Sequence, residues 1–495
     1  MPNLSLNRKP PGSRSYVMAV VAALLMALFS ANTVLTVASI LMLALLVKLL
    51  WRPGGPQVLL YAIGFQWLQA SILIFYADLQ GSPLNALTYF HFVGLERIVS
   101  ATWLTLIGLL VVALGMWLAA GPRYVPDAQP ASAAITAQLS VRRLFFASLA
   151  AIVLAGVLKG MAYMVSGLAE PVNGLVLLRW VVVYLLAYTV FVRQRGYQEL
   201  SIVVGIEITI GFLGFFADFK TVLIVVFLAA TAAPDVLGGV RIRTLAAFGV
   251  LAIALAVVWS SIKIDYRNFL NQGSRGQVIL VSTGDQLAKL ANLLGDLTLE
   301  QVRTGGETLL ARLSYVDYFG AAMDMVPNVI PYEDGKLWGE AIQHVFAPRL
   351  FNPSKPAIND SDRTAYYTGV NVARGEEGTS ASLGYIAETY IDFGPALMMF
   401  PLFLWGLFLG WVYRTLIRSG GYSLFGYACA VAVVFPHASV LEQSNLKLVG
   451  GVVVSFLALY LVQKYFARQL LRELAHPVAA AGFDRRIDSD HGIEC

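Results

Sequence analysis

Ionisable side chains recur inside or beside the long apolar stretches of this chain. Because a charge within a bilayer is costly, such residues mark a functional site by default. The set comprises Lys159, Arg179, Glu207, Asp218, Lys220, Lys263, Asp265 and Arg267. Arg and Lys bind phosphate oxygens strongly where the dielectric constant is low, so cations gathered at one depth suit a diphosphate group.

The same charges also have a purely structural interpretation. Glu207 and Asp218 could neutralise Lys159 and Lys220, and charges near the end of an apolar stretch can reach water. Cations outnumber anions in the set, which favours a binding role for the group. Arg267 and Arg349 flank the polar segment that follows, so both could close over one pocket.

Two residues are candidates for a general base. A lone histidine such as His344 is more often a packing or hydrogen-bonding residue than a base. Glu388 begins an apolar stretch and is either a carboxylate that complements a helix dipole or a proton acceptor. Asp360-Ser-Asp362 resembles the Asp-x-Asp pair that holds a metal ion on the diphosphate of a nucleotide sugar. Nucleotide sugars are cytosolic, however, and this segment is expected outside the cytoplasm. No His, Cys or carboxylate grouping has metal-ligand spacing, so neither a metal nor another cofactor is predicted.

Composition identifies the class of protein in which these residues must be positioned. Of 495 residues, 58% are hydrophobic and 13% charged, and the mean hydropathy is +0.68. A soluble protein has about 25% charged residues. The difference excludes a water-soluble enzyme, a nucleic-acid binder and a disordered scaffold. We therefore predict an all-α polytopic membrane protein.

Twelve apolar stretches have about the length that a membrane-spanning helix needs. They lie near residues 16–30, 33–51, 56–76, 98–120, 144–166, 175–193, 198–216, 221–237, 244–262, 386–413, 422–440 and 448–466. Only Asn32 divides the first two, and their combined length favours a tight hairpin. Lys and Arg concentrate in alternate connections, which predicts that both termini are cytoplasmic.

This plan divides the chain into four parts. They are a transmembrane block of about nine helices at 1–262, an extracytoplasmic loop at 263–385, a block of three helices at 386–475 and a disordered cytoplasmic tail at 476–495. In the loop, residues 285–325 have the apolar spacing of an amphipathic helix. Pro327 and Pro331 break that pattern, and residues 348–382 are expected to be irregular.

A series of motifs from Arg312 to Gly410 resembles the bacterial Wzy-type oligosaccharide repeat-unit polymerases. In order they are Arg312-Leu-Ser314, Ala347-Pro-Arg349-Leu-Phe351-Asn-Pro353-Ser-Lys355-Pro356, Gly378-Thr379-Ser380, Glu388-Thr-Tyr390-Ile-Asp-Phe393-Gly394 and a Gly-rich helix group from Gly406. Upstream, Lys263-Ile-Asp-Tyr266-Arg267 is similar to the family's Lys-x-x-Tyr-Arg element. The twelve-span plan with one large outer loop is also similar to the related O-antigen ligases.

The resemblance implies a membrane glycosyltransferase of the bacterial inner membrane. It would polymerise undecaprenyl-diphosphate-linked repeat units into O-antigen or exopolysaccharide on the outer face, with the large loop in the periplasm. The implied protein partners are a chain-length regulator and a flippase of the same pathway, and nucleic acid is not a partner. Arg and Lys could stabilise the diphosphate leaving group without a metal.

The expected site has catalytic and substrate-binding members. The catalytic candidates are Glu388, His344 and Arg349, and the candidates for binding diphosphate or sugar are Arg267, Lys355, Lys220, Arg179, Tyr266 and Tyr390. Two alternatives remain open. An O-antigen ligase would share the donor and the cations, and a lipid-linked oligosaccharide flippase or transporter would use the buried charges as its pathway.

Overall fold

A computed structural model describes most of the chain. The described residues are 14–52, 57–87, 97–121, 135–164, 169–213, 218–233, 239–274, 278–347, 359–370, 372, 381–419 and 423–476. Their regular secondary structure is helical, without a strand. Eight of their helices are long and apolar enough to cross a membrane: Thr33–Leu50, Val58–Leu79, Ile98–Ala119, Val141–Ala162, Ala169–Arg193, Gly249–Leu270, Met399–Arg418 and Asn445–Leu474. The protein is therefore a helical polytopic membrane protein, as its composition predicts.

Helices occupy the nine apolar stretches expected in the N-terminal block. Ten α-helices are described there, because the stretch at 175–193 contains the end of α7 as well as α8. They are α1 (Arg14–Ala27), α2 (Thr33–Leu50), α3 (Val58–Leu79), α4 (Ile98–Ala119), α6 (Val141–Met164), α7 (Ala169–Val176), α8 (Leu178–Arg193), α9 (Tyr197–Leu213), α10 (Phe219–Ala232) and α11 (Gly239–Leu270), with a short 3-10 helix at Leu84–Ala86. Asn32 separates α1 from α2 and binds the Asp78 carboxylate through its backbone and side-chain N–H groups, both at 2.8 Å. The α11 helix continues beyond residue 262, where the loop was expected to begin.

The segment between α11 and the C-terminal block carries five shorter helices. They are α12 (Thr283–Gly295), α13 (Leu299–Leu313), α14 (Val316–Met325), α15 (Lys336–Phe346) and α16 (Asp360–Thr368). The amphipathic stretch at 285–325 forms three helices rather than one. Ser282 caps the start of α12, and Thr298 divides the stretch because it caps the start of α13.

The expectation of irregular chain throughout 348–382 is wrong for the part that forms α16. The Asn359 side chain accepts a hydrogen bond from the Asp362 backbone N–H at the start of this helix. At its end, Gly369 has a φ of 68°, a left-handed conformation that favours glycine. These two caps form a helix from residues whose polar composition suggested a loop.

The C-terminal block contains α17 (Tyr385–Leu397), α18 (Met399–Arg418), α19 (Ser423–Ala438) and α20 (Asn445–Leu474). The single apolar stretch expected at 386–413 is divided between α17 and α18. Gly394 has a φ of 70° and Pro395 follows it, so the helical path breaks there. The α18 helix is a candidate membrane span, whereas α17 is not. The residues of α17 from Tyr385 to Asp392 are buried.

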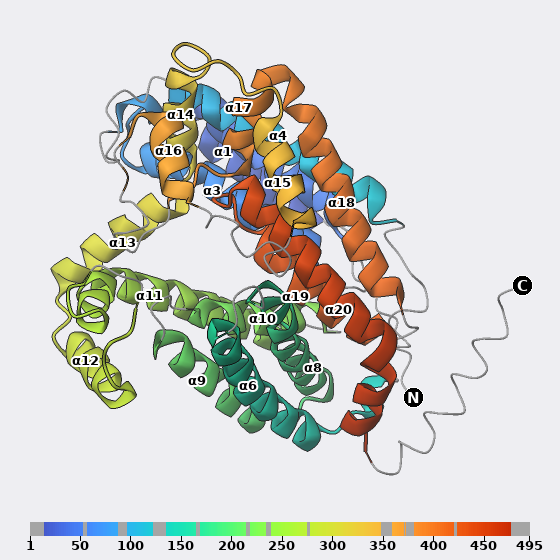
Figure 1. The fold of residues 1–495 in the computed structure, drawn as a ribbon. Coiled ribbons are helices and arrows are strands. Elements are labelled where there is room, and N and C mark those ends of the chain that lie inside the picture. Colours follow the sequence, from blue (N-terminus) through green and yellow to red (C-terminus); the bar gives the residue numbers. More distant parts are fainter. Residues whose placement is uncertain are drawn as a thin grey trace, which may run out of the picture.

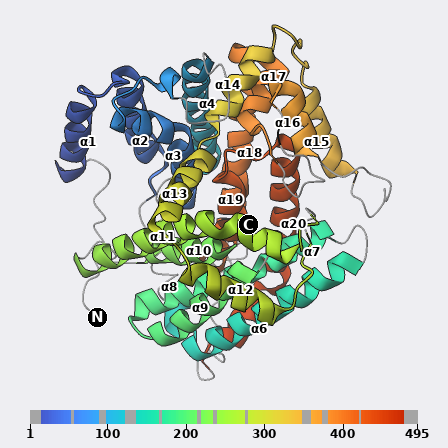
Figure 2. The same ribbon diagram turned by 90° about the vertical axis from the view of Figure 1, so that its left-hand side faces the viewer.

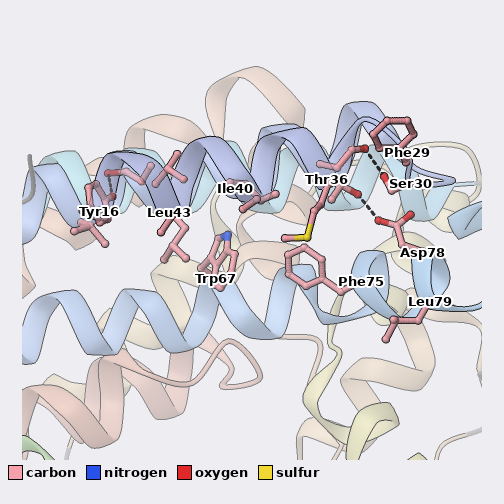
Figure 3. A pocket seen from close by; sticks show the side chains of 17 residues that line it. Tyr16, Phe29, Ser30, Thr36, Ile40, Leu43, Trp67, Phe75, Asp78 and Leu79 are labelled. Carbon is pink, nitrogen blue, oxygen red and sulfur yellow. Dashed lines mark hydrogen bonds between the residues drawn. The ribbon is translucent and has the colours of Figure 1, made fainter. Parts of the chain in front are cut away.

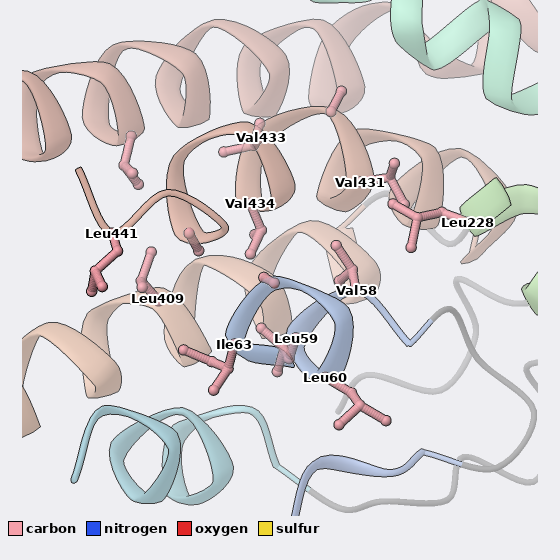
Figure 4. Close-up of a cluster of buried hydrophobic side chains, with 14 of the residues drawn as sticks. Val58, Leu59, Leu60, Ile63, Leu228, Leu409, Val431, Val433, Val434 and Leu441 are labelled. Atoms are coloured by element: carbon pink, nitrogen blue, oxygen red, sulfur yellow. The ribbon is translucent and has the colours of Figure 1, made fainter. Parts of the chain in front are cut away.

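The helices form two groups with the C-terminal pair between them. Figures 1 and 2 show α1–α4 and α14–α18 in one group, and α6 and α8–α12 in the other. The α19 helix contacts α18 and α8, and α20 contacts α15 and α6, so this pair touches both groups. Figure 4 shows part of the shared apolar core, where Val58, Leu59 and Ile63 of α3 lie beside Leu409 of α18 and Val434 of α19.

Glycines allow α4 and α18 to pack at very close range. A Cβ atom added to Gly406 would lie 2.1 Å from the Val112 carbonyl oxygen, and one added to Gly410 would lie 2.5 Å from that of Met116. Small residues four apart allow this kind of backbone contact between membrane helices. The contact fixes α18 against the N-terminal block.

Candidate functional site

A cavity of about 510 Å³ lies where α3, α8, α10, α11, α13 and α19 meet. Four cationic side chains line it: Lys220 of α10, Lys263 and Arg267 of α11, and Arg312 of α13. Lys263 and Arg267 are four residues apart, which places both on one face of α11. We call this space the cationic cavity.

The charges of the cationic cavity are not balanced within it. Asp218 and Glu442 are the carboxylates in its lining. Among the residues that the structure describes, neither Lys220, Lys263 nor Arg312 forms an ion pair. Because cations in a partly buried space bind phosphate oxygens strongly, this excess of positive charge suits an anionic ligand.

Aromatic and amide side chains complete the wall. Trp180 and Trp259 line the cavity together with Gln69 and Gln443. Tyr266 lies behind that wall, fully buried, with its ring 5.8 Å from the ring of Trp259. Tyr266 therefore supports an aromatic wall residue, although sequence reasoning placed it at the substrate.

Arg179, expected at the diphosphate, lies in an ion-pair network. Its guanidinium is 3.5 Å from the Glu207 carboxylate and 3.8 Å from that of Asp218, and its side chain is 10% exposed. It also lies over the Trp180 ring, 4.2 Å from the centroid. The two carboxylates are thus paired, as the structural interpretation expects, but with Arg179 instead of Lys159 and Lys220.

Glu388 is buried within a second network, outside the lining of the cationic cavity. One carboxylate oxygen accepts a hydrogen bond from the Asn445 backbone N–H at 2.7 Å, and the other lies 3.4 Å from the Arg363 guanidinium. Burial raises the pKa of Glu388 to about 7, while Arg363 and the Asn445 N–H group act in the opposite direction. Glu388 thus lies in the first turn of its own helix, α17, and its carboxylate also meets the N-terminus of α20. Its role as a proton acceptor stays a prediction.

The same network joins α15, α16 and α20. Arg363 also pairs with Glu340 of α15 at 2.8 Å, and Lys447 of α20 pairs with Asp360 at 2.7 Å. The Asp360 and Asp362 carboxylates therefore have different partners, Lys447 and the Asn359 amide. Asp360 thus forms an ion pair, and Asp362 takes part in the capping of α16.

The remaining predicted residues are dispersed. Tyr390 is buried in α17, where its hydroxyl donates to the Val326 carbonyl at 3.1 Å and its ring contacts those of Phe319 and Tyr332. His344 is partly exposed near the end of α15. Arg349 and Lys355 lie outside the described residues. Of the nine predicted site residues, the cavity lining contains Arg267 and Lys220.

Sequence reasoning missed several members of the two sites. Arg312 was recognised only as part of a motif, and Glu442, Gln443 and Arg363 were not singled out. The polar run from Glu442 to Asn445 between two apolar stretches was an available signal. Its proximity to α11 and α13 depends on long-range packing, which no local pattern indicates.

A second, apolar cavity lies among α1, α2 and α3. Figure 3 shows Tyr16 towards one end, Asp78 towards the other and Trp67 between them. Its volume is about 780 Å³. Asp78 accepts hydrogen bonds from Asn32 and Thr36, so its charge serves the start of α2.

Comparison with known families gives one match. A family model described as a domain of unknown function, DUF8712, matches residues 244–473, slightly less than half of the chain. The matched region contains Lys263, Arg267, Arg312 and Glu442, whereas Lys220 lies outside it. No curated protein and no solved structure matches the chain significantly.

Proposed function

We propose that this chain is a membrane glycosyltransferase that polymerises undecaprenyl-diphosphate-linked oligosaccharide repeat units into O-antigen or exopolysaccharide. The observation that carries the proposal is the cationic cavity, in which three helices contribute four cations around a space of about 510 Å³. This charge suits the diphosphate of such a donor, and the motif resemblance supplies the reaction.

The proposed reaction exchanges one bond at an anomeric carbon for another. The bond from the donor sugar to the diphosphate breaks, and its electron pair leaves with undecaprenyl diphosphate. The acceptor hydroxyl oxygen forms the new glycosidic bond and gives its proton to a base. Lys220, Lys263, Arg267 and Arg312 would stabilise the negative charge that develops on the leaving group.

Glu442 is our proposed general base. It lines the cationic cavity, and it has no ion-pair partner in the described part of the chain. Asp218, the other carboxylate in the lining, pairs with Arg179. Glu388 instead holds Arg363 and the start of α20, so we assign it a positioning role. A base must lie within hydrogen-bond reach of the proton that it accepts, and Glu442 faces the proposed substrate space.

The proposed topology has twelve spans, with α18 as the tenth. Both termini would be cytoplasmic, and the segment from α12 to α16 would lie in the periplasm beside the inner membrane. In that arrangement the cationic cavity is at the outer face, where lipid-linked repeat units are presented. The concentration of Lys and Arg in alternate connections supports this orientation.

A surface-polysaccharide profile tests the function. A deletion strain of the host would be complemented with the wild type, Arg312→Ala or the control Arg303→Ala. Arg303 is on the same helix but is 83% exposed and pairs with Glu307. At equal protein levels, Arg312→Ala should leave single repeat units on the surface, whereas Arg303→Ala should give normal polymer.

Other profiles would contradict polymerisation in distinct ways. If the deletion strain makes long polymer on its lipid carrier that never reaches the final acceptor, the chain is a ligase. If the deletion strain exports no glycan at all, it is a flippase. Normal polymer in the Arg312→Ala strain would show that the cationic cavity is not the site of polymerisation.

A further inference from the structure

A separate group of charges lies directly behind one wall of the cationic cavity. Arg179 of α8 pairs with Glu207 of α9 at 3.5 Å and with Asp218, at the start of α10, at 3.8 Å. Arg179 and Glu207 are outside the cavity lining, whereas Asp218 is part of it. Arg179 can therefore affect a ligand in the cavity through its neighbours, without touching the ligand itself.

The charges in this group balance one another. Lys159 of α6 lies close enough to interact electrostatically with Arg179, Glu207 and Asp218. Two cations thus face two carboxylates, so the group as a whole is neutral. The side chains of Glu207 and Arg179 are 2% and 10% exposed, so water screens the attraction between them only weakly. The positive charge of the cationic cavity is therefore not used to neutralise these two carboxylates.

Asp218 is the member of this group whose charge matters most for a ligand. It is two residues before Lys220, and both side chains line the cavity. One oxygen of the Asp218 carboxylate accepts a hydrogen bond from the Thr221 hydroxyl, and the other oxygen faces Arg179. Without Arg179, the negative charge of Asp218 would attract the Lys220 ammonium group and repel a phosphate.

We propose that Arg179 is a positioning residue that holds the Asp218 carboxylate away from Lys220 and from the bound diphosphate. In this role Arg179 keeps Lys220 available to the ligand from a place behind the cavity wall. Sequence reasoning placed Arg179 at the diphosphate itself, and this inference moves its effect to the neighbouring carboxylate. The inference rests on the proposed function, because it takes the cationic cavity as the diphosphate site.

Binding of undecaprenyl diphosphate to the purified full-length protein in nanodiscs tests this role. Arg179→Gln/Glu207→Gln removes the buried ion pair without changing the net charge or leaving Glu207 charged and unpaired. This variant should bind the probe roughly fivefold more weakly, because Asp218 loses its partner. Adding Asp218→Asn should restore at least the affinity of the wild type. Adding Asp324→Asn instead is the matched control: it changes the net charge equally, outside the cavity lining, and should restore nothing.

Asp218→Asn alone keeps the inference testable even if folding requires the buried pair. Because Arg179 already neutralises Asp218 in the wild type, this change should alter the affinity less than about twofold. A gain of about fivefold would show that Arg179 does not control the charge of Asp218, and the inference would be wrong.

The remaining outcomes separate this inference from the proposed function. If Arg179→Gln/Glu207→Gln binds the probe as tightly as the wild type, Arg179 has no positioning role, but the diphosphate site stands. If Asp218→Asn does not restore the affinity of that variant, the lost contact between Arg179 and the Trp180 ring explains the weaker binding, and the inference is again wrong. If the wild type does not bind the probe, the proposed function fails as well.

Discussion

At the scale of single residues, the molecule uses its charges in two different ways. Arg179 and Arg363 are each paired with two carboxylates, so they join helices. Lys220, Lys263 and Arg312 line a cavity without an ion pair in the described residues. The distinction cannot be read from residue type or local spacing, because Arg179, Lys220 and Lys263 are all cations near apolar stretches and Arg312 and Arg363 are both cations of the polar loop. It depends on which helix packs opposite each side chain.

The raised pKa of Glu388 gives the stability of the protein a pH dependence. The folded-state pKa is about 7, above the usual value of 4.5, because burial disfavours the charged form. The folded state therefore retains its proton to higher pH than the unfolded state. The contribution of this carboxyl group to stability is greatest below pH 4.5 and is lost as the pH rises to about 7.

We expect the melting temperature of the detergent-solubilised wild type to fall between pH 5 and pH 7.5. Glu388→Gln, which cannot titrate, should show a smaller fall. Asp317 has a pKa raised by burial to about 7 and should account for part of the residual slope. Scanning fluorimetry between pH 5 and pH 7.5 measures the slope of melting temperature against pH for the wild type and for Glu388→Gln. Equal slopes in the two proteins would show that Glu388 is ionised in the folded state at pH 5.

At the scale of helices, apolar runs predicted where helices form better than where they break or turn. Every expected stretch carries a helix, because an apolar run of this length favours helix irrespective of long-range contacts, and eight of the described helices are long and apolar enough to cross a membrane. The division of the stretch at 386–413 was missed, although Gly394 and Pro395 were visible in the sequence. The α16 helix was missed because it is polar and is held by Lys447, which lies far along the chain. The site was predictable only in part for the same reason: α10 and α11 supply recognisable cations, whereas Arg312 and Gln443 become members through packing.

The contact between α4 and α18 should be intolerant of larger side chains. Gly406→Leu places atoms where the Val112 carbonyl now lies, so the helices must separate. We expect a loss of about 3 kcal/mol in the free energy of unfolding, near the upper end for overpacking. Gly156→Leu on exposed α6 is the matched control, since a Cβ atom there meets nothing within 4 Å. Similar melting temperatures for the two variants would contradict the close packing of α4 and α18.

At the scale of the whole molecule, the proposed topology places α12 and the C-terminus on opposite sides of the membrane. The chain has two cysteines, Cys495 at the terminus and Cys429, which is buried in α19. Asn292→Cys on exposed α12 adds a reporter on the proposed outer side. A membrane-impermeant thiol reagent should label Asn292→Cys in intact spheroplasts, even when combined with Cys495→Ser. It should label Cys495 of the wild type only after permeabilisation. Labelling of both positions in intact spheroplasts would refute the twelve-span arrangement.

The contacts that Glu388 and Asp360 make with α20 can form only late in the synthesis of the chain. Because α20 is synthesised after α15, α16 and α17, Glu388 and Asp360 lack their partners Asn445 and Lys447 until α20 has left the ribosome. A polypeptide that stops before α20 would leave these two carboxyl groups without those partners. A chain that lacks α20 should therefore be less stable than the full chain, and a lower melting temperature of the truncated protein would show this.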